Sequence, residues 1–173
     1  VEHESACHIL QKGIADEAAS VRQAALHSVS VRREASLAED VVGALKDKHL
    51  AVRRVAAEAA GRLGVLQAVP PLLWAMSQAE QRVLEHSMVY ALIELGDAAQ
   101  LRAAWKTSDP AARRAILRAL DQMPQSNVDS EWVFESLASD DLRLRKTASW
   151  IIRRHKDWGL QLADFVVKRL PTL

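Results

Sequence analysis

Two groups of residues carry side chains that could do chemistry. His3, Cys7 and His8 offer nitrogen and sulfur ligands near the start of the chain, and the four-residue spacing of His3 and Cys7 would place both on one face of a helix. Structural zinc needs four such ligands, so this pair makes a poor site. Glu85 and His86 are adjacent in the middle of the chain, but no HExxH spacing, paired nucleophile or glycine-rich phosphate loop accompanies them. We therefore expect no bound metal, no catalytic residue and no enzyme activity in this chain.

Composition excludes further classes of protein. Cys7 is the only cysteine among 173 residues, so the sequence has no internal disulfide, no CxxCH haem attachment and no CxxC zinc site. Lys and Arg number 23 against 22 Asp and Glu, and this balance lacks the basic excess typical of nucleic-acid binding. The longest apolar runs, such as residues 88–93, are far shorter than the ~20 residues of a membrane span. We expect no cofactor and no membrane span, and we expect protein, not nucleic acid, as the partner.

One short pattern recurs along the chain: an apolar residue, a charged residue and then small residues at helical spacing. The clearest copy is DKHLAVRRVAAEAAGRLG at residues 47–64. The apolar anchors of the five aligned copies are Val21, Val52, Leu84, Ala112 and Leu144. The intervals between these anchors are 31, 32, 28 and 32 residues, and each interval has room for two helices and two turns.

Helix boundaries can be placed within each copy. The small and apolar residues of a copy fall on one wide helical stripe, which predicts a longer A helix followed by a shorter B helix. Gly64 and Gly96 stand where A helices would end in a left-handed conformation. Asp109 followed by Pro110 is typical of an N-cap and a first helical residue. Ser139 and Asp140 are expected to cap the last A helix.

The predicted fold class is all-α, a right-handed α-solenoid of five helix pairs plus a leading single helix. We predict one domain over residues 1–173, in which residues 1–13 form the B helix of a preceding repeat. The five repeats are predicted at 16–46, 47–77, 78–107, 108–138 and 139–170. The residues expected to be largely buried between layers include Ala56, Leu63, Leu45, Trp105, Leu137, Ile152 and Phe165. The start at Val1 favours a piece of a longer protein.

The copy at 47–64 resembles the HEAT-repeat family, including its bilin-lyase-like short variants, and the resemblance covers nearly all of residues 16–170. The segments 82–97, 113–124 and 147–159 also look like the HEAT segment of large bacterial membrane-bound-dehydrogenase-like proteins. This second resemblance implies an exported, periplasmic protein, with a sugar-dehydrogenase-like propeller before the repeats and a haem-binding c-type cytochrome domain after them. If this second resemblance is set aside, the expected location is cytoplasmic. No catalytic or haem-ligating motif of that family falls on these residues.

An arginine follows the anchor in four of the five repeats, at Arg22, Arg53, Arg113 and Arg145. A ladder of this kind along one edge of the stack could bind an acidic partner. The alternative is that each arginine pairs with a carboxylate or a loop carbonyl of the adjacent repeat, as repeat signatures usually encode contacts between repeats. Repeat three has Glu85 at this position, which interrupts a continuous positive stripe.

The B helices carry most of the tryptophans. Trp105 takes the place of a core leucine in the repeat, whereas positions equivalent to Trp74 hold small or charged residues and predict an indole that faces solvent. The residues predicted to form a partner-binding surface in the middle of the B layer are Trp74, Met76, Arg102 and Trp132. An exposed tryptophan packed flat on its own helix is the alternative interpretation.

Two functions follow from these patterns. The first is a non-catalytic scaffold for protein–protein or interdomain interaction, within a larger exported dehydrogenase-like protein. The second is a nucleic-acid-binding solenoid, since HEAT-like DNA glycosylases use tryptophans and basic residues of the B layer. The B stretches at 66–77 and 126–138 contain no Lys or Arg, which favours the scaffold. A lyase acting on a bound tetrapyrrole would rest on analogy of fold alone.

Overall fold

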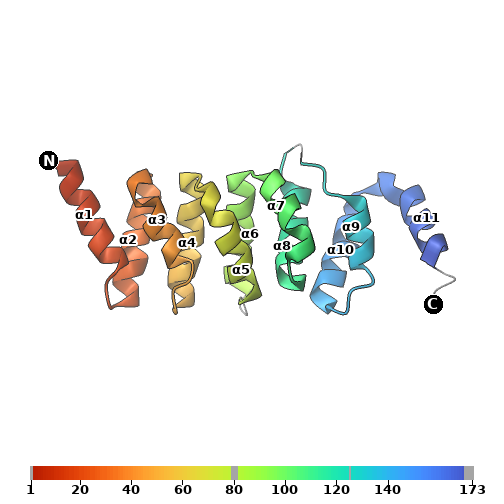
Figure 1. Cartoon of the computed structure of the whole chain (residues 1–173), viewed down its shortest axis with the longest axis horizontal. Coiled ribbons are helices and arrows are strands. Elements are labelled where there is room, and N and C mark those ends of the chain that lie inside the picture. Colours follow the sequence, from red (N-terminus) through yellow and green to blue (C-terminus); the bar gives the residue numbers. More distant parts are fainter. Residues whose placement is uncertain (1, 79–81, 125, 170–173) are drawn as a thin grey trace.

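The protein is described by a computed structural model that covers residues 2–78, 82–124 and 126–169, with side chains from Ser5 onward. Over these ranges the chain forms eleven α-helices, joined in places by single 3-10 turns, and no β-strand. Figure 1 shows the helices following one another from α1 to α11 along one long axis. The all-α prediction is therefore confirmed for the part of the chain that the structure describes.

Longer and shorter helices alternate along most of this row. The even-numbered helices are α2 (Ala19–Arg32), α4 (Leu50–Leu63), α6 (Arg82–Leu95), α8 (Pro110–Gln122) and α10 (Leu142–Arg154). The odd-numbered helices are α1 (Glu2–Ile14), α3 (Ala38–Ala44), α5 (Val69–Ser77), α7 (Ala98–Ala104), α9 (Ser130–Ser136) and α11 (Gly159–Arg169). The even-numbered helices pack on one another in chain order, which is consistent with stacked helix pairs.

Each predicted repeat contains one even-numbered helix followed by the next odd-numbered one, and α1 corresponds to the leading helix predicted at 1–13. Residue 1 of the predicted leading helix and residues 79–81, 125 and 170 of the predicted repeats lie outside the described residues.

Local sequence explains where these helices begin and end. Gly64 and Gly96 have φ angles of 67° and 69°, in the left-handed region that glycine tolerates, and they follow the last residues of α4 and α6. The carboxylate of Asp109 accepts a hydrogen bond from the amide of Ala112, which caps α8 ahead of Pro110. For α10, the predicted caps are wrong by one or two residues. The helix begins at Leu142, so Asp141 is the N-cap and accepts from the amide of Leu144 at 2.6 Å.

Small side chains bring neighbouring even-numbered helices close together. Ala56, Ala57, Ala59 and Ala60 of α4 are all fully buried. At Gly61, a Cβ atom would lie 3.1 Å from the backbone Cα of Ala91 on α6, a closer approach than packed side chains normally make. Gly61 thus lies on the face of α4 on which α6 stacks.

The predicted core is partly confirmed. Ala56, Leu45 and Trp105 are buried. The prediction was too strong for four residues that are only partly buried, although they pack against the core: Leu63, Leu137, Ile152 and Phe165. Phe165 lies on α11, and no later helix covers α11 among the described residues. Leu63 is the last residue of α4, so fewer neighbouring side chains cover it.

Every helix in the described ranges is too short or too polar to cross a lipid bilayer.

Candidate functional site

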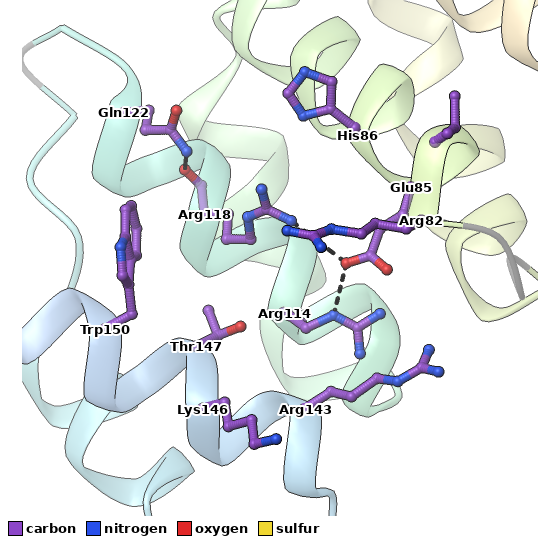
Figure 2. Close-up of a pocket in the computed structure, with 11 residues that line it drawn as sticks. Arg82, Glu85, His86, Arg114, Arg118, Gln122, Arg143, Lys146, Thr147 and Trp150 are labelled. Atoms are coloured by element: carbon purple, nitrogen blue, oxygen red, sulfur yellow. Dashed lines mark hydrogen bonds and ion pairs between the residues drawn. The ribbon is translucent and has the colours of Figure 1, made fainter.

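An open groove with a volume of about 910 Å³ lies across α6, α8 and α10. It brings together charged residues from three successive even-numbered helices, as Figure 2 shows. The charged residues that line it are Arg82 and Glu85 from α6, Arg114 and Arg118 from α8, and Arg143 and Lys146 from α10. Five cations therefore face one carboxylate, and a groove of this kind concentrates positive potential.

The floor of the groove is an ion-paired triad. Glu85 Oε1 accepts a hydrogen bond from Nε of Arg114 at 3.0 Å and from Nη1 of Arg118 at 3.4 Å. The side chains of Arg114 and Glu85 are only 6% and 12% exposed. Because one carboxylate serves two guanidinium groups, the floor keeps an excess of positive charge.

The rim adds three further cations. Arg82, Arg143 and Lys146 are exposed. In the described part of the chain their side chains form no ion pair and no hydrogen bond. No carboxylate in the described ranges forms an ion pair with them, and they are available to an anionic ligand.

Trp150 of α10 forms the aromatic wall of the groove. The guanidinium of Arg154 lies 4.7 Å from the centroid of its ring. Asp121, whose side chain is 1% exposed, holds Arg154 at 3.2 Å and the Nε2 atom of His155 at 2.7 Å. Trp150 is thus held in place by a polar cluster that joins α8 to α10.

The positive surface ends towards α4. Glu58 of α4 has the same register as Arg118 and Trp150, six residues after the repeat anchor, and it pairs with Arg54 at 2.5 Å. Glu94 of α6 is also exposed, and it lies close to Gly61 of α4, the helix that carries the Arg54–Glu58 pair. The cationic groove is therefore confined to three helices and is not a track along the whole stack.

The partner-binding residues predicted on the B layer do not form one surface. Trp74 is 48% exposed, with Nζ of Lys46 at 5.9 Å from its ring centroid. Met76 is 1% exposed, so the prediction that it contributes to a surface is wrong. Met76 has the same register as the buried residues Leu45 and Trp105, and this register points its side chain into the core.

Trp132 and Arg102 are half-buried and have partners inside the fold. The ring of Trp132 stacks on Trp105, with centroids 4.7 Å apart and planes 7° from parallel. Nη2 of Arg102 donates to the backbone carbonyls of Ser126 and Asn127, in the connection that leads to α9. Of the four candidates, Trp74 alone presents a large exposed side chain.

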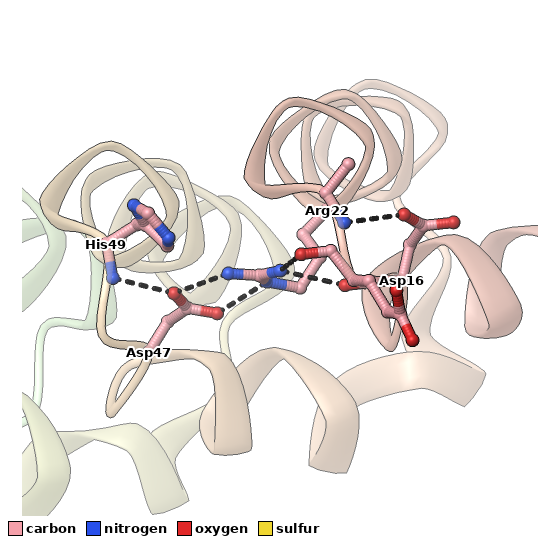
Figure 3. Close-up of polar contacts among 6 residues, drawn as sticks. Asp16, Arg22, Asp47 and His49 are labelled. Carbon is pink, nitrogen blue, oxygen red and sulfur yellow. Dashed lines mark hydrogen bonds and ion pairs between the residues drawn. The ribbon is translucent and has the colours of Figure 1, made fainter.

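The first arginine of the predicted ladder joins two successive repeats, as Figure 3 shows. Arg22 donates through Nε and Nη2 to the carboxylate of Asp47 at 2.7 and 2.9 Å, and through Nη1 to the carbonyls of Asp16 and Glu17. Burial alone would raise the pKa of Asp47, but the hydrogen bonds from Arg22 and from the amide of His49 outweigh it and hold that pKa below its usual value. The hydrogen bond to Asp47 also raises the pKa of Arg22.

The other ladder arginines are half-buried, and two of them donate hydrogen bonds to backbone carbonyls. Arg113 donates to the carbonyls of Trp105 and Lys106, each at 3.2 Å, and Arg145 donates to the carbonyl of Ser139. Nε of Arg53 is buried without a hydrogen-bond partner. These side chains do not line the groove described above.

Sequence reasoning missed the groove because it concentrated on the residue directly after each anchor. The groove residues Arg114 and Lys146 lie two residues after their anchors, and Arg118 lies six residues after its own. Basic residues at these offsets were the available signal. In the sequence Glu85 interrupts the arginine ladder, and in the structure its side chain accepts hydrogen bonds from two arginines of α8.

The described residues contain no group of three or more side chains that could hold a metal ion. The side chain of His3, one member of the pair considered above, lies outside the described side chains.

Comparison of the chain with models of protein families and with curated proteins gave no match in either case. The function must therefore be argued from the fold and from the groove.

Proposed function

We propose that this chain is a non-catalytic scaffold, a right-handed solenoid of five HEAT-like helix pairs after a leading helix, which binds a protein partner or a flanking domain. The binding site is the groove across α6, α8 and α10, and its ligand is an acidic protein segment. The observation that carries this proposal is the set of rim cations, Arg82, Arg143 and Lys146, for which the described part of the chain provides no acidic partner.

The period of the sequence supports the solenoid. Helices one repeat apart have the same register, and the small residues of α4 allow α6 to stack closely on it. A single helix pair could not bury its apolar stripe without such a neighbour. In a protein of this kind function resides in a presented surface, and the groove is the surface with the clearest chemical character.

The extent of the groove favours a protein ligand over nucleic acid. A phosphate backbone needs a basic track several nucleotides long, and its affinity comes from many Lys and Arg contacts. Here the positive surface stops at the Arg54–Glu58 pair, and the whole chain carries only one net positive charge. A short acidic segment matches a groove that spans three helices.

We expect binding of an acidic peptide to depend on the rim. Arg143→Glu combined with Lys146→Glu places two negative charges in the groove, and like charges across an interface repel the ligand. A fluorescein-labelled peptide of glutamate, glycine and leucine, followed by fluorescence anisotropy, should bind the double variant at least about tenfold more weakly than the natural sequence.

The matched control is Lys12→Glu combined with Lys48→Glu, which makes the same change in net charge at exposed positions far from the groove. This control should keep most of the affinity. If both double variants lose affinity equally, binding follows net charge and not the groove. If DNA binds with micromolar affinity at physiological salt and the peptide does not, the protein-scaffold proposal is wrong.

A further inference from the structure

We infer that the groove holds a subsite for a phosphate group, and that its acidic partner is a phosphorylated protein segment. This inference rests on the proposed function, because it specifies the chemistry of the segment that the groove binds.

The first observation is the state of Arg114. Its side chain is only 6% exposed, yet only its Nε atom donates a hydrogen bond to Glu85. No described residue accepts a hydrogen bond from its Nη1 or Nη2 atoms, although the residue lines the groove. Neither Nη atom is among the described atoms that are buried without a partner, so both reach the open groove, where an anion can accept their hydrogen bonds in place of water. These donors are therefore available to an anion in the groove.

The second observation is what surrounds those donors. Arg143 and Lys146 of α10 line the same groove beside Arg114, together with the hydroxyl of Thr147, as Figure 2 shows. A guanidinium fork and an ammonium group are the usual combination at phosphate sites, because the fork gives two parallel hydrogen bonds and the ammonium adds a point charge.

The number of donors distinguishes phosphate from carboxylate. Glu85 supplies one carboxylate, and it satisfies Nε of Arg114 while leaving the two Nη groups open. A second carboxylate would bring one charge and two oxygens to Arg114, Arg143 and Lys146. A phosphate monoester brings a charge of about −1.5 to −2 and three strong acceptor oxygens, which matches this set better.

The test compares three fluorescein-labelled peptides of one sequence, with serine, glutamate or phosphoserine at the central position of an otherwise acidic segment. We expect the phosphoserine peptide to bind at least about tenfold more tightly than the glutamate peptide, the effect of one or two added charge-assisted hydrogen bonds. In the variant Arg143→Gln with Lys146→Gln this preference should fall to about twofold or less. Both changes are at exposed positions, so the fold should persist.

Arg114→Lys tests the guanidinium fork directly, because it keeps the charge and removes the paired donors. We expect it to bind the glutamate peptide nearly as well as the natural sequence and to lose most of the preference for phosphoserine. Circular dichroism will show whether the variant is folded. If it is not, the exposed double variant decides the question.

Other outcomes separate this inference from the proposed function. Equal affinity for the glutamate and phosphoserine peptides would overturn the phosphate subsite and leave the acidic-segment proposal standing. Absence of binding by all three peptides would overturn both. If inorganic phosphate alone displaces the glutamate peptide at the concentration at which the phosphopeptide does, the site belongs to the free ion. If a single-stranded oligonucleotide competes best, the ligand is nucleic acid and the inference is wrong.

Discussion

Replacing Trp105 by alanine is expected to lower the free energy of unfolding by about 3–5 kcal/mol, the usual range for removing a buried large aromatic side chain. Trp105 is 5% exposed, and it stacks on Trp132 of the next repeat. The guanidinium of Arg113 lies 5.2 Å from its ring centroid. The variant therefore loses core packing and also one of the contacts that join repeats three and four. Urea unfolding followed by circular dichroism measures the effect.

Trp74→Ala is the matched control, since it removes the same side chain from an exposed position on α5. It should change stability by about 0.5 kcal/mol or less. A loss well below 1 kcal/mol for Trp105→Ala, or equal losses for the two variants, would contradict the burial of Trp105 and its stacking on Trp132.

Replacing Glu85 by alanine is expected to destabilise the protein by about 2–3 kcal/mol. Removing one partner of a buried ion pair leaves the other charge uncompensated, which costs about 3–5 kcal/mol where the pair is fully buried. The open groove and the partly exposed Arg118 reduce that cost here. The same variant should bind an acidic peptide more tightly, because the internal competitor for Arg114 and Arg118 is gone. Urea unfolding and peptide anisotropy on the same preparation measure both effects.

Glu85→Ala combined with Arg114→Met provides the control. Removing both charges leaves no buried cation, so the double variant should recover part of the stability that Glu85→Ala loses. It should not share the gain in peptide affinity. If Glu85→Ala is as stable as the natural sequence, the triad is too well solvated to organise the groove.

The helices could be predicted from sequence because their determinants are local. An apolar stripe, a glycine at a left-handed helix end and an aspartate before a proline each act within one helix or one turn. Gly64 and Gly96 have the predicted left-handed conformation, and Asp109 is the predicted N-cap. The burial of Trp105 also followed from the register of the repeat. The same register places Met76 in the core, so its predicted place on a binding surface conflicts with the repeat pattern itself.

The groove could not be predicted from any one repeat. Its charges come from three helices, and Glu85 meets Arg114 and Arg118 only because α6 packs beside α8. The stacking of Trp132 on Trp105 and the contact of Arg102 with a loop likewise depend on packing between repeats. Repeat alignment shows which residues share a position, whereas the ion pairs depend on how far neighbouring helices are shifted along each other.

The most direct test of the groove as the binding site uses two tryptophans on different helices. Trp150 lines the groove on α10. Trp74 is exposed on α5, one of the odd-numbered helices that correspond to the predicted B helices. In a nitrogen–proton NMR spectrum the indole N–H signals can be assigned with Trp150→Phe and Trp74→Phe variants, and the acidic peptide can then be titrated. We predict that the Trp150 signal shifts in a saturable manner while the Trp74 signal stays in place. A saturable shift of Trp74 with Trp150 unchanged would place the partner on the B helices and contradict this account.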